Sequence, residues 1–597
     1  MNSSQNIQEL EQKFAGYNEL KAITSRFIEN KLTWEALKAK AKNISDIQDV
    51  ASSLKLTDIQ KLQLKTLFFP QQTPQLEESK EISNVNSPNV KIPEAAIPKT
   101  TKPKKLPKVV INTTRSRGEL KLLERIIEKN KAFGWKKAIG SNGGGDVMWS
   151  GLDIPWEDTY LAKEIRLNRI PGMKMLAHKK MTGFYLNKFR EFYPEEFDFY
   201  PKTFLLPEEY DQFKEYKSKH PDRLFIAKPT SGSQGDGIIL VRKASDLAPS
   251  STITNEMVVQ EYIDKPLLLD DKKFDLRLYV LISNVKPVIA FLNEEGLARF
   301  CTEAYQAPTQ ENLKNAYMHL TNYSLNKLSQ NYKYTEECVE INDGSKRTFT
   351  SFWKSIEKAG YSKDEILTNI KSLVQKLVFA LEPVIQFNYN VAFEGKDDGM
   401  CFHVLGVDVL IDQDLKPWLL EINANPSLNI GHEDSMDPKA KEIISPVDQF
   451  VKEKVIEDSI LITRKSVAKQ LNTESYRTFT KVYDTQTVDE FDEMNLFKDI
   501  LYIFEKLSGV RFKTHLTSSK FVKLAAIRGM TNEHVVKANY DIIYQKAIKL
   551  SDDNQMNFPS FIKAIEDITI LLNKGTYTFE NKKELIENTI QLIRAGL

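Results

Sequence analysis

The stretch KPWLLEINANPSL, Lys416 to Leu428, is the most informative about both the fold and the candidate site of this chain. An apolar run, Trp418 to Leu420, ends abruptly in Glu421, Ile422 and Asn423. Because side chains alternate along a strand, the carboxylate of Glu421 and the amide of Asn423 are predicted to point to the same side. Two oxygen-bearing groups at the end of a hydrophobic strand suit a hard cation. The alternative is a strand end whose Asn-Pro simply opens a turn.

The segment before this one carries a second acidic residue of the same kind. LGVDVLID places Asp408 between Val407 and Val409, inside an apolar strand. A carboxylate in such a strand needs a partner, and a divalent metal shared with Glu421 and Asn423 supplies one.

A lysine and a glycine-rich loop lie further upstream. IAKPTSGSQGDGIIL runs from a strand with Lys228, through a Ser/Gly loop with Gln234 and Gly235, into a second apolar strand. Glycines let backbone N–H groups approach phosphate oxygens, and a lysine beside them neutralises the charge. A hairpin with a surface lysine shows the same pattern, so this interpretation needs support from other segments.

The segment VVQEYIDKPLLLDDKKFDLRLYVLI adds charged residues in a strand pattern. Residues 260–263 end one strand with backbone groups suited to reading an adenine edge. Lys273, Asp275 and Arg277 alternate, so they share one face of the next strand. Buried, they would need anionic or polar partners; a solvent-facing strand is the alternative.

Composition bounds the cellular setting. Lys and Arg number 83 against 81 Asp and Glu, so net charge predicts no polyanionic partner, and we expect no nucleic acid. The three cysteines, Cys301, Cys338 and Cys401, have no metal-type spacing and indicate a reducing compartment without a disulfide framework. No uncharged run reaches membrane-spanning length, so we expect no membrane association.

At 597 residues the chain is too long for one core. Strand-like and helix-like runs alternate in its middle, which predicts an α/β fold with one long helix over roughly residues 363–385. The expected divisions are a helical segment at 1–69, a disordered basic and Pro-rich linker at 70–107, a catalytic domain at 108–465, a linker at 466–490 and a helical module at 491–597.

Taken in order, several motifs resemble the tubulin–tyrosine ligase-like family over roughly residues 109–465. They are RIPGM, HKK, the SGSQGDG loop, VVQEYI, KFDLRLYVL, EGLARF, MHLTNYS and VDVLID with LLEINANPSL. The resemblance implies an ATP-grasp-type fold. It also implies ATP and Mg²⁺ as cofactors, with an acyl phosphate as the intermediate through which an amide bond is formed.

The resemblance also assigns residues to roles. Mg²⁺ would be held by Asp408, Glu421 and Asn423. Residues implied for the nucleotide are Lys179, Lys228, Gln234, Gly235, Gln260, Glu261, Tyr262, Ile263, Lys273, Phe274, Asp275, Thr321 and Asn322. Arg277 and Arg299 would stabilise negative charge on the transferred group and act with Glu421 in catalysis.

Within that family the sequence is most similar to the tubulin polyglutamylases. The similarity lies in MHLTNYSLNK and in the later GSKR at 344–347. The implied reaction adds free glutamate to glutamate side chains in the acidic C-terminal tails of tubulin. Arg299, Tyr323, Ser324 and Lys346 are the residues expected to hold the incoming glutamate, since a dicarboxylic substrate needs cationic partners. The expected location is the cytoplasm and cytoskeleton, with the cilium or basal body as a narrower candidate.

One residue departs from the family pattern. Asp236 stands after Gln234-Gly235, where the glutamylases usually carry a basic residue. An aspartate repels an acidic acceptor tail, which favours the alternative of a non-catalytic microtubule-binding scaffold with a ligase fold. A glycine ligase is a third possibility, but Arg299 and the GSKR segment argue against it because glycine has no second carboxylate to hold.

The helical tail, about residues 497–572, resembles the tubulin polymerization-promoting protein family, whose fold is EF-hand-like. The matching stretches are ILYIFEKLSGVRFKTHLTSSKFVKLAAIRGM, VVKANYDIIYQKAI and MNFPSFIKAIEDI. The loop SDDNQMNFPSFI lacks the central Gly and the closing Glu of a calcium loop, so we expect no calcium there. A plain helical packing module is the alternative.

Overall fold

The computed structural model describes residues 106–139, 144–152, 165–230, 237–247, 256–393, 399–432, 443–486, 491, 494–508, 514–549, 551 and 554–597. They belong to one compact unit, Pro103–Leu597. The segment expected to be helical at 1–69 and nearly all of the linker expected at 70–107 lie outside the described residues. So do Gln234, Gly235 and Asp236.

A small parallel sheet comes first along the chain. Its strands are β1 (Val110–Arg115), β2 (Lys136–Lys137), β3 (Val147–Ser150) and β4 (Arg166–Leu167), in the order β2-β1-β3-β4. The helix α7 (Leu120–Lys129) buries Leu122, Leu123 and Ile126. Their three- and four-residue spacing puts them on one helix face, which packs with β1 and β3 in a single apolar cluster.

A second, antiparallel sheet contains the strands on both sides of the glycine-rich loop. Its strands are β5 (Thr203–Leu206), β6 (Phe225–Pro229), β7 (Ile239–Val241) and β8 (Met257–Glu261), in the order β5-β8-β6-β7. The helices α9 (Lys179–Phe192) and α10 (Tyr210–Lys219) contact β5. Phe204, Phe213 and Phe225 form the aromatic centre of this subdomain.

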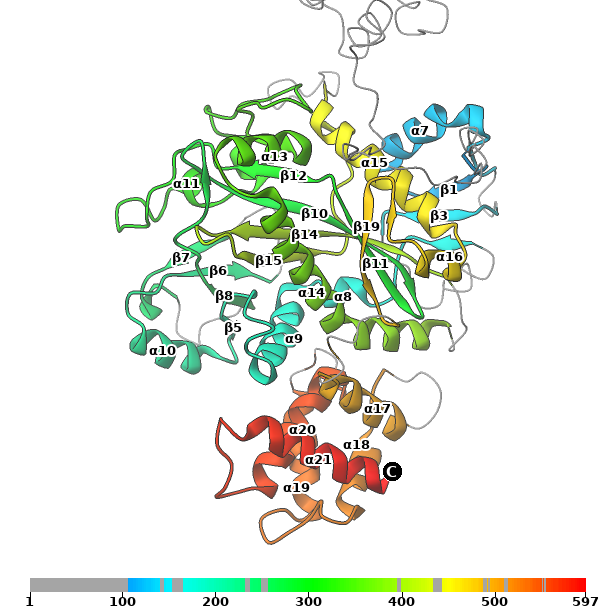
Figure 1. The fold of residues 1–597 in the computed structure, drawn as a ribbon. Coiled ribbons are helices and arrows are strands. Elements are labelled where there is room, and N and C mark those ends of the chain that lie inside the picture. Colours follow the sequence, from blue (N-terminus) through cyan, green and yellow to red (C-terminus); the bar gives the residue numbers. More distant parts are fainter. Residues whose placement is uncertain are drawn as a thin grey trace, which may run out of the picture. The chain divides into compact units, whose positions relative to one another are not determined.

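The central sheet is the largest (Figure 1). Its main strands are β10 (Lys272–Val285), β11 (Val288–Asn293), β12 (Leu297–Phe300), β13 (Lys346–Thr348), β14 (His403–Ile411), β15 (Pro417–Asn423), β18 (Ser475–Tyr476) and β19 (Phe479–Asp484). Neighbouring strands pair antiparallel. The long helices beside it are α14 (Lys363–Phe393) and α15 (Pro446–Thr463).

Both faces of β10 are covered by helices. Leu276 and Leu278 belong to one apolar cluster with residues of α14, whereas Tyr279 and Leu281 belong to another with residues of α15. This division follows from the two-residue alternation of a strand. A charged residue on β10 is therefore screened from solvent wherever a helix or strand lies over it.

Helix α14 is longer than the sequence indicates. It passes through Pro383 and ends at Phe393, beyond the end predicted near residue 385. Phe387, Tyr389 and Phe393 are all buried, so the last two turns of the helix also pack against the apolar core.

Residues 466–490, expected to form a linker, hold structure that completes the central sheet. The helix α16 (Val467–Leu471) is followed by β18 and β19. β19 pairs with β11, with Asn293 opposite Phe479 and Ile289 opposite Asp484. The sheet thus extends past the boundary expected at residue 465, because β11 would otherwise leave its backbone hydrogen-bonding groups unpaired on that edge.

The C-terminal part is helical, as predicted. Its helices are α17 (Leu496–Ser508), α18 (Ser518–Phe521), α19 (Lys537–Ile548), α20 (Phe558–Leu572) and α21 (Lys582–Gly596), drawn orange to red in Figure 1. Shorter elements elsewhere are α8 (Met173–Leu176), β9 (Leu268–Leu269), α11 (Ala316–His319), α12 (Tyr323–Asn326), α13 (Phe349–Lys358), β16 (Gly431–His432) and β17 (Ile443–Ile444).

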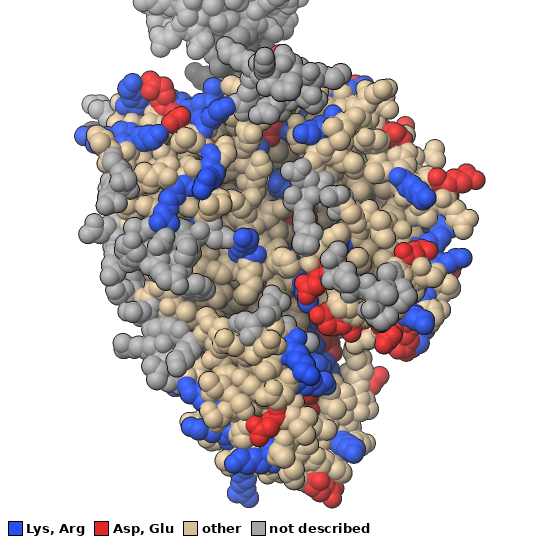
Figure 2. Space-filling model, turned by 180° about the vertical axis from the view of Figure 1, so that it is seen from behind, with Lys and Arg blue, Asp and Glu red and all other residues tan. Residues whose placement is uncertain are grey.

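The distribution of surface charge and the state of the cysteines agree with what the composition predicts. Figure 2 shows basic and acidic side chains interspersed over one face, in keeping with a net charge of +2. Cys301, Cys338 and Cys401 are all free thiols that form no disulfide with one another. Among the described helices, none combines the length and apolar character needed to cross a membrane.

Candidate active site

The end of β15 has the geometry that its alternation predicts. Asp408 on β14 lies opposite Glu421, and Gly406 lies opposite Asn423. The Asn423 amide Nδ2 donates to the Glu421 Oε1 at 3.2 Å, so these two side chains share one side of the strand. The three expected metal ligands are therefore neighbours on adjacent strands. Within the described ranges, no group of three or more His, Cys, Asp or Glu is arranged for a metal; the expected set includes an amide, and its role stays a prediction.

The charged residues on β10 are buried among partners. Arg277 binds the Asp408 carboxylate through Nε and Nη2, the latter at 2.8 Å from Oδ2. Arg299 on β12 binds both oxygens of Asp275 at 2.7 Å and also reaches Asp408 Oδ2 at 2.8 Å. Thr321 donates to Asp275 Oδ2 at 2.5 Å. The solvent-facing alternative for this strand is wrong, because these side chains form one buried ionic network.

The arginines fix the charge state of the network. Burial alone would raise the pKa of Asp408, but the Arg277 and Arg299 guanidiniums hold that pKa well below its usual range. Asp408 is therefore an anion across the physiological range. Among the residues that the structure describes, its Oδ1 accepts only from Arg277, whereas Oδ2 accepts from both arginines.

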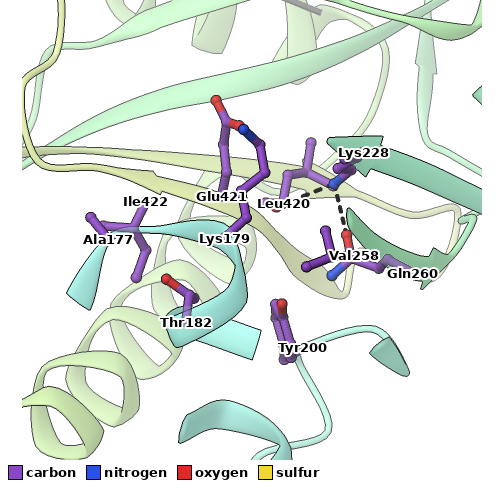
Figure 3. A pocket seen from close by; sticks show the side chains of 10 residues that line it. All are labelled: Ala177, Lys179, Thr182, Tyr200, Lys228, Val258, Gln260, Leu420, Glu421 and Ile422. Atoms are coloured by element: carbon purple, nitrogen blue, oxygen red, sulfur yellow. Dashed lines mark hydrogen bonds between the residues drawn. The ribbon is translucent and has the colours of Figure 1, made fainter. Parts of the chain in front are cut away.

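A small pocket lies where the second sheet faces β15 (Figure 3). Lys179, Lys228, Gln260 and Glu421 line it from α9, β6, β8 and β15. Lys228 Nζ donates to Gln260 Oε1 at 2.8 Å and to the Leu420 carbonyl at 3.4 Å. Burial lowers the pKa of Lys228 to about 8, partly offset by Glu421. Four predicted residues thus meet in one place.

A second buried lysine lies at the start of β10. Lys273 Nζ donates to the Tyr262 hydroxyl at 2.9 Å and lies 4.2 Å from that ring's centroid. Burial lowers the pKa of Lys273 to about 8. Tyr262 in turn contacts His319 Nδ1 at 3.2 Å, and burial lowers the pKa of His319 to about 4, so this imidazole is neutral.

Other residues expected at the nucleotide are placed less directly. Glu261 forms an ion pair with Arg223 at the partly exposed end of β8. Phe274 packs on Phe300 and Phe352, at centroid distances of 5.5 and 5.1 Å. Its side chain is turned away from Lys273 and Asp275, because neighbours on a strand face opposite sides; only its backbone remains available for a nucleotide. Asn322 and Ile263 are half-buried.

Three of the four residues expected to hold glutamate come together. Arg299 lies directly opposite Lys346 across the β12–β13 pair. The Lys346 ammonium lies 4.0 Å from the centroid of the Tyr323 ring. Ser324 is half-buried in the same short helix, α12, as Tyr323.

The sequence analysis missed two charged residues beside Lys346. Asp448 and Lys452, both buried on α15, contact each other at 2.8 Å, and Asp448 also pairs with Lys346. SPVD at the start of α15 marks a helix N-terminus, but its proximity to Lys346 is not visible in the sequence.

These features lie in a region that matches a known family. Residues 160–460 match the Tubulin-tyrosine ligase family, and the chain therefore belongs to it. It is 38% identical over 362 residues to Tubulin polyglutamylase TTLL11 of Homo sapiens, which covers 59% of this chain and 50% of that protein. It is 36% identical over 298 residues to Tubulin polyglutamylase ttll6 of Danio rerio, covering 50% and 36%.

A third relative is the Probable beta-tubulin polyglutamylase of Tetrahymena thermophila, 35% identical over 341 residues that cover 55% of this chain and 27% of that protein. The chain spans half or less of the length of these three relatives.

Proposed function

We propose that this chain is an ATP- and Mg²⁺-dependent ligase that adds glutamate to glutamate side chains in the C-terminal tails of tubulin. The observation that carries the proposal is the adjacency of two sets of residues. Arg299 contacts Asp408 of the expected metal set and lies opposite Lys346 of the expected amino-acid set. The names of the three relatives above support the same reaction.

The buried lysines support a nucleotide at this site. Among the described residues, Lys228 and Lys273 form no ion pair, although both are buried. A buried ammonium without an anion is costly, and phosphate oxygens would remove that cost. We propose that Lys179, Lys228, Gln260, Tyr262 and Lys273 hold ATP. Gln234 and Gly235 are proposed for the same nucleotide from their sequence alone.

The oxygen donors fit Mg²⁺. Glu421 and Asn423 offer a carboxylate and an amide side by side, and carboxylate and amide oxygens are the ligands this ion prefers. Asp408 completes the proposed set through Oδ1, which accepts only one of the three bonds from the arginines.

The chain's own residues would orient the reactants. ATP, when bound, would supply the phosphoryl group that activates the acceptor carboxylate for attack by the amine of glutamate. Arg277 is held by Asp408, and Arg299 is held by both Asp275 and Asp408, so their positive charges are fixed in place before any reaction. Lys346 and Tyr323 would hold the incoming amino acid beside them.

We further propose an ATP-grasp-type core and an EF-hand-like C-terminal module. In the module, α17–α18 and α19–α20 are two helix–loop–helix units, the plan of an EF-hand. An isolated antiparallel bridge pairs Leu516 with Met556 and joins the two loops. A module of this kind on a tubulin ligase would act near microtubules, and we propose the cytoskeleton as its location.

The proposal is tested by incubating purified microtubules with the full chain, Mg-ATP and radiolabelled glutamate, with glycine in parallel. We expect glutamate to be incorporated by the wild type and by Glu215→Gln, which removes an exposed carboxylate on α10. Glu421→Gln should lower incorporation at least a hundredfold, because a metal ligand is lost without a change of bulk. Glycine uptake would indicate the glycine ligase. Microtubule binding without uptake of either amino acid would indicate the scaffold.

A further inference from the structure

Lys346 belongs to a buried cluster that spans two distant parts of the chain. Its ammonium forms an ion pair with Asp448 Oδ2 on α15. The other carboxylate oxygen, Oδ1, binds Lys452 Nζ at 2.8 Å. The side chains of Lys346, Asp448 and Lys452 are only 12%, 7% and 6% exposed, so all three are shielded from water.

The cluster has an excess of positive charge. Two ammonium groups face one carboxylate, and within the described part of the chain neither lysine forms an ion pair with another acid. Lys452 also donates to the Asn429 carbonyl at 2.6 Å, which holds it in place but adds no negative charge. Arg299 lies next to the cluster, opposite Lys346. A buried excess charge of this kind is stabilised by an anionic ligand.

Helix capping does not account for Asp448. The Asp448 backbone N–H donates to the Ser445 side chain at 3.2 Å, as the third helical residue does at a capped N-terminus. In a capping box its side chain would reach back to the Ser445 backbone. Here both carboxylate oxygens bind lysines instead.

We propose that Asp448 is the positioning residue of the amino-acid site: it holds the Lys346 ammonium beside Arg299 and Tyr323, and with Lys452 it leaves one positive charge for the second carboxylate of a dicarboxylic amino acid. This inference rests on the proposed function. It adds a residue pair that selects glutamate over a neutral amino acid.

Charge coupling within the cluster gives a direct test. The groups that face Lys346 are Arg299 from β12, Tyr323 from α12, and Asp448 and Lys452 from α15. Burial lowers the pKa of Lys346, Asp448 raises it, and Lys452 and Arg299 lower it. Removing Asp448 should therefore lower that pKa further, and removing Lys452 should raise it.

The first experiment needs no turnover. Competitive acetylation of lysines in the full chain, followed across pH by peptide mass spectrometry, reports the pKa of Lys346. We expect Asp448→Asn to lower it, Lys452→Met to raise it, and Glu453→Gln, which breaks an outer ion pair of α15 with Arg125, to leave it unchanged. An unchanged pKa in both Asp448→Asn and Lys452→Met would overturn the inference, whatever the activity of the chain.

The second experiment measures the KM for glutamate. In Asp448→Asn it should rise more with pH than in the wild type between pH 6.5 and 8.5, by about tenfold for each unit by which the pKa of Lys346 falls. The KM for ATP should not change, and Asp448→Glu should restore the wild-type profile. A glutamate KM with the same pH profile in Asp448→Asn and wild type would contradict the proposal. Wild type without glutamate incorporation would instead reject the proposed function, and the acetylation result would still decide whether Asp448 is coupled to Lys346.

Discussion

Phe189 on α9 stacks on Phe497 on α17, with ring centroids 4.2 Å apart and ring planes 15° from parallel. This pair joins the helix that lines the candidate nucleotide pocket to the first helix of the C-terminal module. Ion pairs surround it: Lys188 binds Glu566 at 2.6 Å, and Lys582 binds Glu191. The module is therefore packed against the domain that matches the tubulin-tyrosine ligase family, through both apolar and charged contacts.

Removing the stacked ring should weaken this packing. We expect Phe497→Ala to lower the free energy of unfolding by about 3 kcal/mol, the usual cost of deleting a buried aromatic ring. The urea midpoint followed by circular dichroism measures the loss. Phe579→Ala, at a side chain that is 73% exposed, is the matched control and should leave the midpoint unchanged. Equal midpoints for Phe497→Ala and the control would show that the stacking contributes nothing.

Arg299 connects the two carboxylates Asp275 and Asp408 with a planar guanidinium. A compact ammonium cannot reproduce the planar fork that binds both oxygens of Asp275 and also Asp408, so Arg299→Lys should raise the KM for glutamate by about a hundredfold, which corresponds to about 3 kcal/mol. Steady-state glutamate incorporation measures this change. Arg125→Lys, which alters a partly exposed pair with Glu453, should behave as wild type. A wild-type KM in Arg299→Lys would exclude Arg299 from the amino-acid site.

Nucleotide affinity should depend on pH through the buried lysines. Burial lowers the pKa of Lys273 to about 8, so its charge in the free protein is lost as pH rises through that value. A phosphate binds the charged form, and ATP affinity should therefore fall above about pH 8, by up to tenfold per pH unit for each lysine that titrates. Calorimetric titration from pH 7 to 9.5 tests this.

The Lys273→Arg variant separates this residue from Lys228, whose pKa is also lowered to about 8 by burial. Arginine keeps its charge throughout, so the fall in affinity should become shallower without disappearing. An unchanged slope in Lys273→Arg would assign the pH dependence to Lys228 alone.

Local patterns in the sequence predicted the site better than they predicted the sheet around it. Alternation along KFDLRLYVL and WLLEIN correctly grouped Asp275 with Arg277 and Glu421 with Asn423, because strand geometry depends only on neighbours. β19 was missed because its short run, FTKVYD, pairs with a strand almost two hundred residues earlier, and no local signal marks that pairing. Asp448 was missed for the same reason, since it lies 102 residues from Lys346.

Helix α9 has a practical consequence for anyone who wants to isolate the family domain without the C-terminal helices. Its first turn borders the candidate nucleotide pocket at Lys179, and its last turn packs under the C-terminal helices through Phe189 and Phe192. A fragment cut at residue 490 would leave those two rings and Phe387, which contacts Phe504, facing water. Such a truncated protein would tend to self-associate through this patch, so the shortest well-behaved fragment has to keep the C-terminal helices.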